Sequence, residues 1–125
     1  MRIRIIGSMS FYDDFVALRT QLEGMGHATY IPVKFHGEGN IQEHRREAIE
    51  RFRNELEISD CILVVNNKKG SIESYIGVGA GIEIGLALGK GKKIYMLKEP
   101  VGEVADYYSA IGYTAINGDL RKITN

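Results

Sequence analysis

Short apolar runs alternate along the chain with longer segments in which apolar residues recur every three or four positions. The short runs predict β-strands at residues 2–7, 28–33, 60–66, 92–98 and 113–116. The wider spacing predicts α-helices over residues 12–25, 41–58 and 78–89, with shorter helices over 102–111 and 118–123. Each connection is long enough for a right-handed crossover. We therefore predict an α/β fold: a single three-layer domain over residues 1–125, around a parallel, doubly wound sheet of about five strands, flavodoxin-like or Rossmann-like.

The apolar positions also predict which faces are buried. The run 60-DCILVVN-66 is almost unbroken, which is typical of a strand covered on both sides of a parallel sheet. Pro32 and Pro100 mark the ends of two strands, because proline cannot donate to a ladder. The helical stripes predict two inner faces: Phe15, Leu18, Leu22 and Met25 on the first helix, and Ile41, Ala48, Ile49, Phe52 and Leu56 on the second.

Composition excludes several classes of function. The chain has 125 residues with 16 basic and 16 acidic side chains, so it lacks the basic surplus used to bind nucleic-acid polymers. We expect no membrane span and no secretory signal, because the apolar windows are too short, and therefore a cytoplasmic location. The single cysteine, Cys61, excludes an internal disulfide, and its apolar surroundings predict a buried structural thiol. The chain offers no cluster of metal ligands, and we expect no metal and no cofactor.

In an open parallel sheet, ligands bind beyond the carboxyl ends of the strands, where the strand order reverses. Three segments should meet there: 7-GSMSFY-12, 66-NNKKGSIESYIG-77 and 77-GVGAG-81. The first and third contain glycine and small residues, which let a ligand approach the backbone. The segment has no Gly-Lys-Ser/Thr ending of a Walker loop, and GVGAG does not directly follow a strand as a dinucleotide fingerprint does.

Glu83 is the single acidic or basic side chain between Ser74 and Gly89, apart from the weakly acidic Tyr75. The amino end of a helix favours an ionised carboxylate, whereas apolar surroundings favour a neutral one. Two interpretations stay open: a carboxylate kept for chemistry beside an open space, or one that caps backbone amides or pairs with an arginine in the core. Its neighbours one helical turn away are all small or apolar: Gly79, Ala80, Leu86 and Ala87.

Three motifs carry a resemblance to a known family. They are a strand followed by Gly-Ser (3-IRIIGSM-9), a helix that runs into an Asp opening a central strand (56-LEISDCILVV-65), and a glycine-rich helix start with Glu-hydrophobic-Gly-x-Ala before a glycine-lysine turn and a strand (79-GAGIEIGLALGKGKKIYML-97). In these motifs, the chain resembles the nucleoside 2-deoxyribosyltransferases and their relatives, the deoxynucleoside 5'-monophosphate N-glycosidases. The resemblance covers roughly residues 1 to 100.

The resemblance implies cleavage or transfer of the N-glycosidic bond of a (deoxy)nucleoside or its 5'-monophosphate. In that family the glutamate of the Glu-x-Gly segment attacks the anomeric carbon of a 2-deoxyribose and expels the base, and another base or water then releases the sugar. Glu83 holds this position, so the resemblance implies that it is the catalytic nucleophile. It also implies a small-molecule nucleoside or nucleotide as partner and a homo-oligomer. The implied substrate-binding residues are Gly7, Ser8, Met9, Tyr12, Asn66, Gly79, Ala80 and Gly81.

The chain departs from the family pattern at the position of the proton donor. The family usually carries an acid after the central strand, where this chain has Asn66 and Asn67. Transferases often have an Asp six residues before the nucleophile, where this chain has Gly77. The other candidate donors also fit solvated positions: Glu73, His36 and His44.

Two functions are compatible with these residues. The first is an enzyme with Glu83 as nucleophile, in which Tyr12 is a candidate to orient it. Lys68 and Lys69 either meet a 5'-phosphate or face solvent. Hydrolysis of a nucleotide is favoured over base exchange, because the transferase Asp is absent and the loop is basic. The second is a non-catalytic nucleotide-binding or sensing module, which the two asparagines favour.

Overall fold

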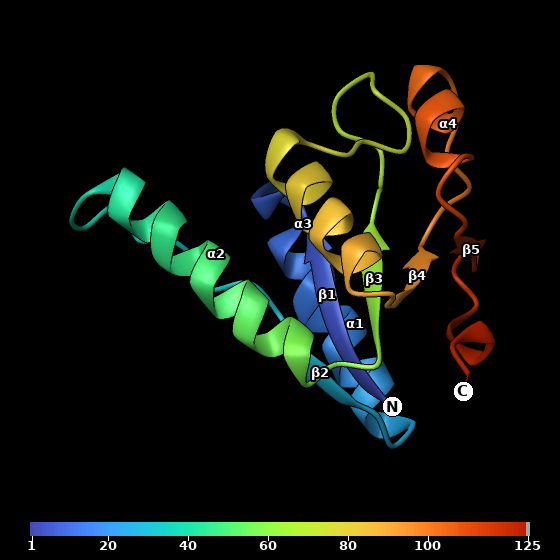
Figure 1. Ribbon diagram of the computed structural model, residues 1–125, viewed down its shortest axis with the longest axis horizontal. Helices are drawn as coiled ribbons and strands as arrows, with labels where there is room; N and C mark the ends of the chain where they lie inside the picture. The colour runs from blue at the N-terminus through green and yellow to red at the C-terminus, as the bar shows by residue number, and fades with distance from the viewer. Residues whose placement is uncertain (125) are drawn as a thin grey trace.

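Five parallel strands form the centre of the structure, in the order β2-β1-β3-β4-β5 (Figure 1). This computed structural model describes residues 1–124. The strand order reverses between β1 and β3, as in other doubly wound sheets of the flavodoxin-like type. The predicted α/β fold class is therefore confirmed. The strands are β1 (Arg2–Gly7), β2 (Ala28–Tyr30), β3 (Cys61–Val65), β4 (Lys93–Met96) and β5 (Thr114–Ala115).

Helices cover both faces of the sheet and complete the three layers (Figure 1). Helix α1 (Tyr12–Gly24) packs on one face, and α2 (Ile41–Glu57) and α3 (Val78–Gly89) pack on the other. The shorter elements α4 (Glu103–Tyr108) and η2 (Leu120–Lys122, a 3-10 turn) follow β4 and β5. A further 3-10 turn, η1 (Met9–Phe11), precedes α1 and was not predicted. Within residues 1–124, no helix has the length and apolarity needed to cross a lipid bilayer.

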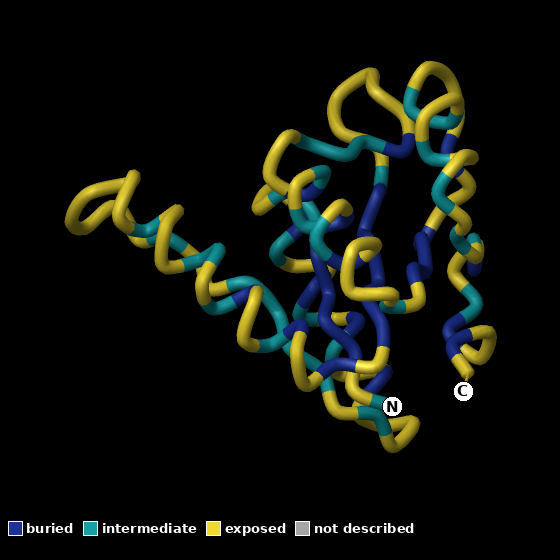
Figure 2. The backbone as a smooth tube through the Cα atoms, viewed as in Figure 1, coloured by how far each residue is buried: buried dark blue, intermediate teal, exposed yellow. Residues whose placement is uncertain are grey.

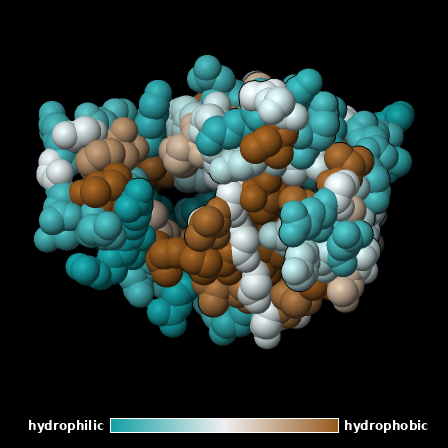
Figure 3. Space-filling view, turned by 90° about the horizontal axis from the view of Figure 1, so that it is seen from above, coloured by the Kyte–Doolittle hydropathy of each residue, from teal (hydrophilic) through white to brown (hydrophobic). Residues whose placement is uncertain are grey.

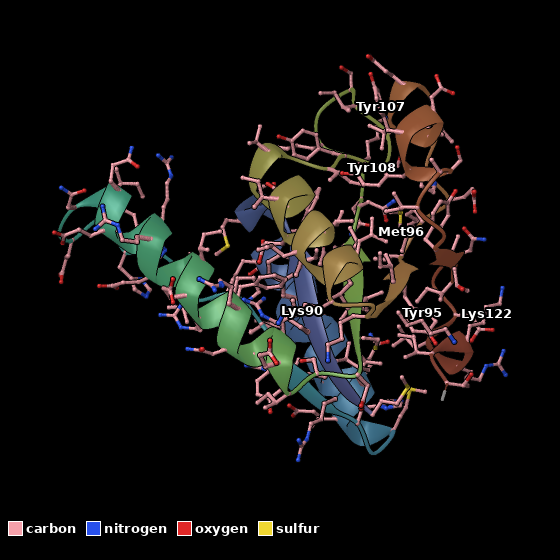
Figure 4. The ribbon with its side chains drawn as sticks, viewed as in Figure 1. Lys90, Tyr95, Met96, Tyr107, Tyr108 and Lys122 are labelled. Carbon is pink, nitrogen blue, oxygen red and sulfur yellow. The ribbon has the colours of Figure 1, made fainter. Side chains whose placement is uncertain are left out.

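Side chains of the central strands alternate between two separate core clusters. Ile5 of β1 joins the cluster under α1, whereas Ile6 joins the cluster under α2 and α3. Tyr95 and Met96 of β4 are divided between the two clusters in the same way (Figure 4). Every residue of β3 is buried, as its apolar run predicts (Figure 2). Cys61 is one of these residues, and burial raises the pKa of its thiol to about 12, which confirms a buried structural thiol.

Some strand ends differ from the prediction. Strand β2 pairs with β1 only from Ala28 to Tyr30, so residues 31–33 lie outside the sheet. Pro32 has no backbone N–H, and the ladder cannot continue through it. Strand β4 ends at Met96, although the Leu97 N–H still donates to the Val64 carbonyl oxygen over 2.9 Å.

The first half of α2 projects beyond the sheet (Figure 1). The prediction that Ile41 lies on an inner helix face is wrong, because its side chain is 39% exposed in this projecting half. Met25 is also wrongly predicted as buried: it is the C-cap of α1 and is 45% exposed. In the second half of α2, Phe52 and Leu56 are buried as predicted. Only that half lies over the sheet.

Gly7 ends β1 at the reversal of strand order, where the backbone is closely surrounded. A Cβ atom on this residue would lie 2.8 Å from the Val65 carbonyl oxygen and 3.1 Å from the Phe15 ring. The first of these contacts is with the backbone of β3, which cannot rotate away as a flexible side chain can. Glycine is therefore required here by the close approach of β1, β3 and α1.

We expect Gly7→Ala to lower the free energy of unfolding by about 1–3 kcal/mol, because an added methyl group overpacks a closed site. Gly85→Ala is the matched control. No atom lies within 4 Å of a Cβ at Gly85 in α3, so alanine there should stabilise the protein by up to about 1 kcal/mol through helix propensity. Denaturant unfolding measures both effects. Equal stability of Gly7→Ala and the wild type would contradict the close contact.

Candidate active site

The turn after β1 places two hydroxyl groups at the carboxyl end of the sheet. Ser8 is the N-cap of η1, and its Oγ accepts a hydrogen bond from the Ser10 N–H over 3.3 Å. The two serine hydroxyls lie 2.8 Å apart. Lys69, in the loop after β3, donates from Nζ to Ser8 Oγ over 3.4 Å. A lysine from a distant part of the sequence thus contacts the predicted residue Ser8, which follows Gly7.

The loop after β3 contacts the turn after β1 at further points. Asn67 Nδ2 donates to the Asp14 carboxylate over 3.0 Å. Tyr75 packs edge-on against Phe11, with ring centroids 6.5 Å apart. Lys69 Nζ lies 4.7 Å from the centroid of the Tyr75 ring. These contacts bring the first two predicted segments, 7–12 and 66–77, onto one surface.

Met9 and Tyr12 lie on the same turn but differ in their surroundings. Met9 is in η1 and its side chain is exposed. Tyr12 begins α1, and its half-buried ring packs edge-on against Phe15 with the centroids 6.3 Å apart. Lys34 Nζ lies 5.4 Å from the centroid of the Tyr12 ring. No hydrogen bond joins Tyr12 to Glu83 within the described part of the chain, so an orienting role for this tyrosine stays a prediction.

Asn66 contacts a different part of the molecule. It is fully buried, its Nδ2 donates to the Lys98 carbonyl oxygen, and its Oδ1 accepts from the Lys98 N–H, each over 2.9 Å. Both ends of the amide therefore hold the segment after β4. Asn66 lines a hollow of about 540 Å³ at the ends of β3, β4 and β5. Gly7, Ser8 and Glu83 do not line this hollow. The side chain of Asn66 thus serves the segment after β4, although its backbone follows Val65, the partner of Gly7 in the β1–β3 ladder.

The glycine-rich start of α3 presents backbone more than side chains. Gly77 is its N-cap and offers no side chain to the first turn. Gly79 is exposed, with open space where a Cβ would lie, whereas Ala80 is packed into the core. Gly81 faces α4, and the Tyr108 hydroxyl would lie 3.4 Å from its Cβ (Figure 4).

Glu83 lies on the side of α3 that faces α2. Lys90, about two turns further along the same side of the helix, forms a 2.6 Å ion pair with Glu57 of α2 (Figure 4). The Glu83 side chain is half-buried. Seen from the carboxyl ends of the strands, the surface is hollowed between the projecting half of α2 and the body of the molecule (Figure 3).

Two charged residues on neighbouring elements act on Glu83. Burial raises the pKa of Glu83 to about 7, Arg4 of β1 opposes this rise, and Glu55 of α2 adds to it. Arg4 and Glu55 are themselves an ion pair, with Arg4 Nε 3.1 Å from Glu55 Oε1. Burial thus favours the neutral acid at Glu83, and Arg4 favours the carboxylate.

The structure separates the interpretations of Glu83 that the sequence left open. Within residues 1–124, Glu83 caps no backbone amide and forms neither a hydrogen bond nor an ion pair. An arginine is close enough to lower its pKa, but the ion pair of Arg4 is made with Glu55. Glu83 is thus a half-buried carboxylate without a hydrogen-bond or ion-pair partner among the described residues.

The other candidate proton donors have contacts of their own or face solvent. Glu73 forms a 3.4 Å ion pair with Lys68 on the surface. His44 lies in the projecting half of α2, and its ring packs against the Phe35 ring from the preceding loop, with centroids 4.8 Å apart. His36 is exposed. Among the described residues, no three His, Cys, Asp or Glu side chains gather in a way that could hold a metal ion.

Arg4 and Glu55 were not identified from the sequence. The segment 2-RIRIIG-7 mixes alternation with a short apolar run and predicts a strand, but it does not show which way its arginines point. A central strand of a sheet covered on both sides has no polar face, and its middle residues are buried. The signal that could have identified Arg4 was its charge in the middle of the first strand. That strand was expected to lie in the same covered sheet as the apolar strand at 60–66.

The chain has the fold of solved 2-deoxyribosyltransferases and of a CMP N-glycosidase. The 2-deoxyribosyltransferase of Bacillus psychrosaccharolyticus superposes with a TM-score of 0.62 at 14% identity, over 84% of this chain and 80% of that one. The CMP N-glycosidase of Clostridium botulinum has a TM-score of 0.60 at 15% identity, over 94% and 90% of the two chains. The 2-deoxyribosyltransferase of Leishmania mexicana has a TM-score of 0.57 at 20% identity, over 86% and 71%. The predicted resemblance is thus confirmed at the level of the fold.

The sequence itself matches no family profile and no curated protein. At identities of 14% to 20%, the structural likeness establishes the fold, while the chemistry has to be argued from the residues of this chain.

The raised pKa of Glu83 makes the stability of the fold depend on pH. The folded protein holds this proton more tightly than the unfolded chain, so the stabilisation is complete below the ordinary value of 4.5 and is lost as the pH rises through about 7. We expect Glu83→Gln to exceed the wild type in free energy of unfolding above pH 7, by on the order of 2 kcal/mol. Below pH 4.5 the two proteins should have similar stability. Denaturant unfolding across this range measures the difference, and a constant difference would contradict the raised pKa.

Proposed function

We propose that the protein cleaves or transfers the N-glycosidic bond of a deoxynucleoside or its 5'-monophosphate, with Glu83 as the nucleophile. The observation that carries this proposal is the half-buried carboxylate of Glu83, which has no hydrogen-bond or ion-pair partner among the described residues and lies on the side of α3 that faces α2. The fold supports it, because proteins with this fold include 2-deoxyribosyltransferases and a CMP N-glycosidase.

In the proposed reaction, a carboxylate oxygen of Glu83 attacks the anomeric carbon of the sugar. The bond from that carbon to the base nitrogen breaks, and its electron pair leaves with the base, which takes up a proton. Water or a second base then attacks the same carbon and releases a proton to solvent, which breaks the ester and restores the Glu83 carboxylate. Two successive displacements retain the configuration at the anomeric carbon. The attack requires ionised Glu83, and Arg4 is the neighbouring charge that favours this form.

The chain places amides, and no carboxylic acid, directly after β3. Asn66 is bonded to Lys98, and Asn67 donates to Asp14. In our proposal the departing base therefore takes its proton from water. This arrangement favours substrates whose base leaves without strong help from an acid.

A 5'-monophosphate suits the surface formed by the first two segments better than an uncharged nucleoside does. On this surface, Lys69 Nζ lies within hydrogen-bonding distance of Ser8 Oγ, and Ser8 Oγ lies within hydrogen-bonding distance of Ser10 Oγ. Phosphate oxygens accept hydrogen bonds from hydroxyls and ammonium groups and carry the charge that lysine complements. We therefore propose a nucleotide as the substrate and hydrolysis as the preferred outcome.

A second candidate function is the binding or sensing of a nucleotide without catalysis. Asn66 favours it, because its amide is fully engaged with Lys98 at the position where an acid would assist the reaction. The two functions share the same binding surface and differ in whether Glu83 forms a bond with the sugar.

Incubation with a panel of deoxynucleosides and their 5'-monophosphates, with and without an acceptor base, tests the proposal. We expect release of base from a monophosphate, with a rate that rises with pH through about 7 as Glu83 ionises. Glu83→Gln should lower turnover by about 10³-fold or more, because it removes the nucleophile. Turnover that survives in Glu83→Gln would overturn the assignment. Saturable nucleotide binding with no turnover would support the second candidate.

Lys69 and Lys68 form a matched pair for testing the phosphate contact. Lys69 reaches Ser8, whereas Lys68 is paired with Glu73. We expect Lys69→Ala to raise the KM for a 5'-monophosphate by about 10- to 100-fold, the usual effect of losing a charge-assisted hydrogen bond. Lys68→Ala should leave this KM unchanged, and neither variant should alter the KM for the nucleoside. Equal effects of both variants would indicate a general field of charge with no specific contact.

A further inference from the structure

The hollow beside Asn66 has the size and the position of a ligand site. Its volume of about 540 Å³ lies within the range of pockets that hold small molecules in proteins, roughly 300 to 1,000 Å³. Residues that follow β3, β4 and β5 line it, at the edge where a parallel sheet receives its ligands. Val101 is the one apolar residue among the described residues that line it. This hollow, named the Asn66 pocket from here on, therefore offers polar groups to a ligand.

Two residues of the Asn66 pocket have a backbone conformation that non-glycine residues rarely adopt. Ser74 has a φ of 42° and Asn117 a φ of 48°, and no other non-glycine residue within residues 1–124 has a positive φ. Asparagine tolerates this region, but serine adopts it at a cost in free energy. Such conformations persist only where the surrounding structure fixes them, and they are frequent at ligand sites. These two come from distant loops and line the same pocket.

Three side chains of the pocket fix the backbone of the segment after β4. The Asn66 amide bonds to both backbone groups of Lys98, and Ser74 Oγ accepts from the Val101 N–H over 3.1 Å. Asn117 Oδ1 accepts from the Glu99 N–H over 3.2 Å. Asn66 is fully buried and Ser74 is 4% exposed, so packing also holds them in place. The walls of the pocket are therefore ordered before a ligand binds, which lowers the entropy cost of binding.

These bonds occupy acceptor atoms and leave donors over. The Glu99 N–H can bond only to the amide oxygen of Asn117, so Nδ2 is the free end of that amide. The Ser74 oxygen accepts from Val101, so its own hydrogen remains available. Within residues 1–124, neither group has an acceptor, and neither does Lys98 Nζ. The three donors indicate a ligand that accepts hydrogen bonds.

The charges of the pocket favour an anionic ligand. Two lysines and two glutamates line it, and their pairing decides which charge is available. Lys68 and Glu73 form a 3.4 Å ion pair, and one oxygen of Glu99 accepts the Tyr113 hydroxyl over 2.8 Å. Lys98 lines the pocket without an ion-pair partner in the described part of the chain. A carboxylate or phosphate group supplies the acceptor oxygens and the negative charge that these donors lack.

The loop after β3 separates this pocket from the candidate active site. Its neighbouring residues contact different surfaces: Lys69 and Tyr75 reach the turn after β1, whereas Lys68 and Ser74 line the pocket. Two backbone hydrogen bonds between Lys69 and Ile72, over 2.9 and 3.0 Å, close the loop. The pocket is therefore a site of its own, and the loop is the wall that it shares with the active-site surface.

We propose that the Asn66 pocket binds a small molecule through a carboxylate or phosphate group, with Lys98, Asn117 and Ser74 as the donors. Ser74 and Asn117 hold the backbone of residues 98–101 and also offer the two neutral donors, which gives their unusual conformations a common reason. The site is distinct from the surface around Ser8, so this inference does not depend on the proposed function.

Titration of the 125-residue chain with inorganic phosphate and, separately, with succinate tests the proposal through the NMR shifts of its backbone amides. We expect saturable shifts at Ser74, at residues 98–101 and at Asn117 with at least one of the two anions. Saturation by phosphate alone would identify a phosphorylated ligand, and saturation by succinate alone a carboxylic acid. Absence of saturable shifts at these amides with both anions would overturn the proposal.

Lys98→Ala should weaken the binding of the saturating anion by about 10- to 100-fold, because it removes a charge-assisted hydrogen bond. Lys90→Ala is the matched control, since this surface lysine is paired with Glu57 and lies outside the pocket. It should leave the dissociation constant unchanged. Equal weakening in the two variants would show a general attraction of anions to the surface and would contradict a specific site.

Asn117→Gly separates binding from structure. Glycine adopts a φ of 48° without strain, so this variant should fold, but it lacks the amide that donates to the ligand. We expect its dissociation constant to rise by about 2- to 10-fold, the effect of one neutral hydrogen bond. The amide signals of β1 and β3 should stay in place and report the intact fold. Wild-type affinity in this variant would show that Asn117 serves the turn alone, contrary to the proposal.

The same spectra keep this site apart from the proposed active site. Phosphate bound at the candidate active site should shift the amides of Ser8 and Ser10, and Lys69→Ala should abolish those shifts while the shifts of residues 98–101 remain. A response confined to Ser8 and Ser10, with both anions, would reject the Asn66 pocket and support the phosphate contact of the active site. A response confined to the pocket residues would do the reverse.

Discussion

A parallel sheet covered on both faces has no place for an uncompensated charge, and this constraint organises the molecule around β1 and β3. Strand β3 meets it with five apolar residues, all buried. Strand β1 meets it at every interior position except Arg4, whose charge has to be balanced within the protein. Glu55 of α2 does so through an ion pair 3.1 Å long. The placement of α2 therefore depends on an electrostatic requirement as well as on the apolar packing of Phe52, which shares its core cluster with Ile84 of α3 and the strands.

The same sheet determines where a ligand can be received. Because all strands are parallel, their carboxyl ends lie together, and the loops after β1 and β3 meet through the contacts of Lys69 with Ser8 and of Tyr75 with Phe11. The close approach of these strands at Gly7 leaves no room for a side chain. The contacts of Asn66 with Lys98 belong to the neighbouring strand ends and stabilise the structure beside this surface.

Glu83 lies where two physical effects oppose one another. Its half-buried position on α3 favours the neutral acid, while Arg4 favours the carboxylate. In the proposed reaction, the carboxylate form would attack the sugar, and Arg4 is the neighbouring charge that favours this form.

The sequence by itself determined the order of strands and helices, the burial of β3 and Cys61, and the position of Glu83 on an apolar helix, because these follow from local spacing of apolar residues. It placed Ile41 and Met25 on inner faces wrongly, since local spacing does not show how far the sheet extends under a helix or where a helix ends. Only the tertiary structure brought Lys69 to Ser8, turned Asn66 toward Lys98 and paired Arg4 with Glu55. These contacts join residues far apart in the chain, and charge balance inside the core depends on that three-dimensional proximity.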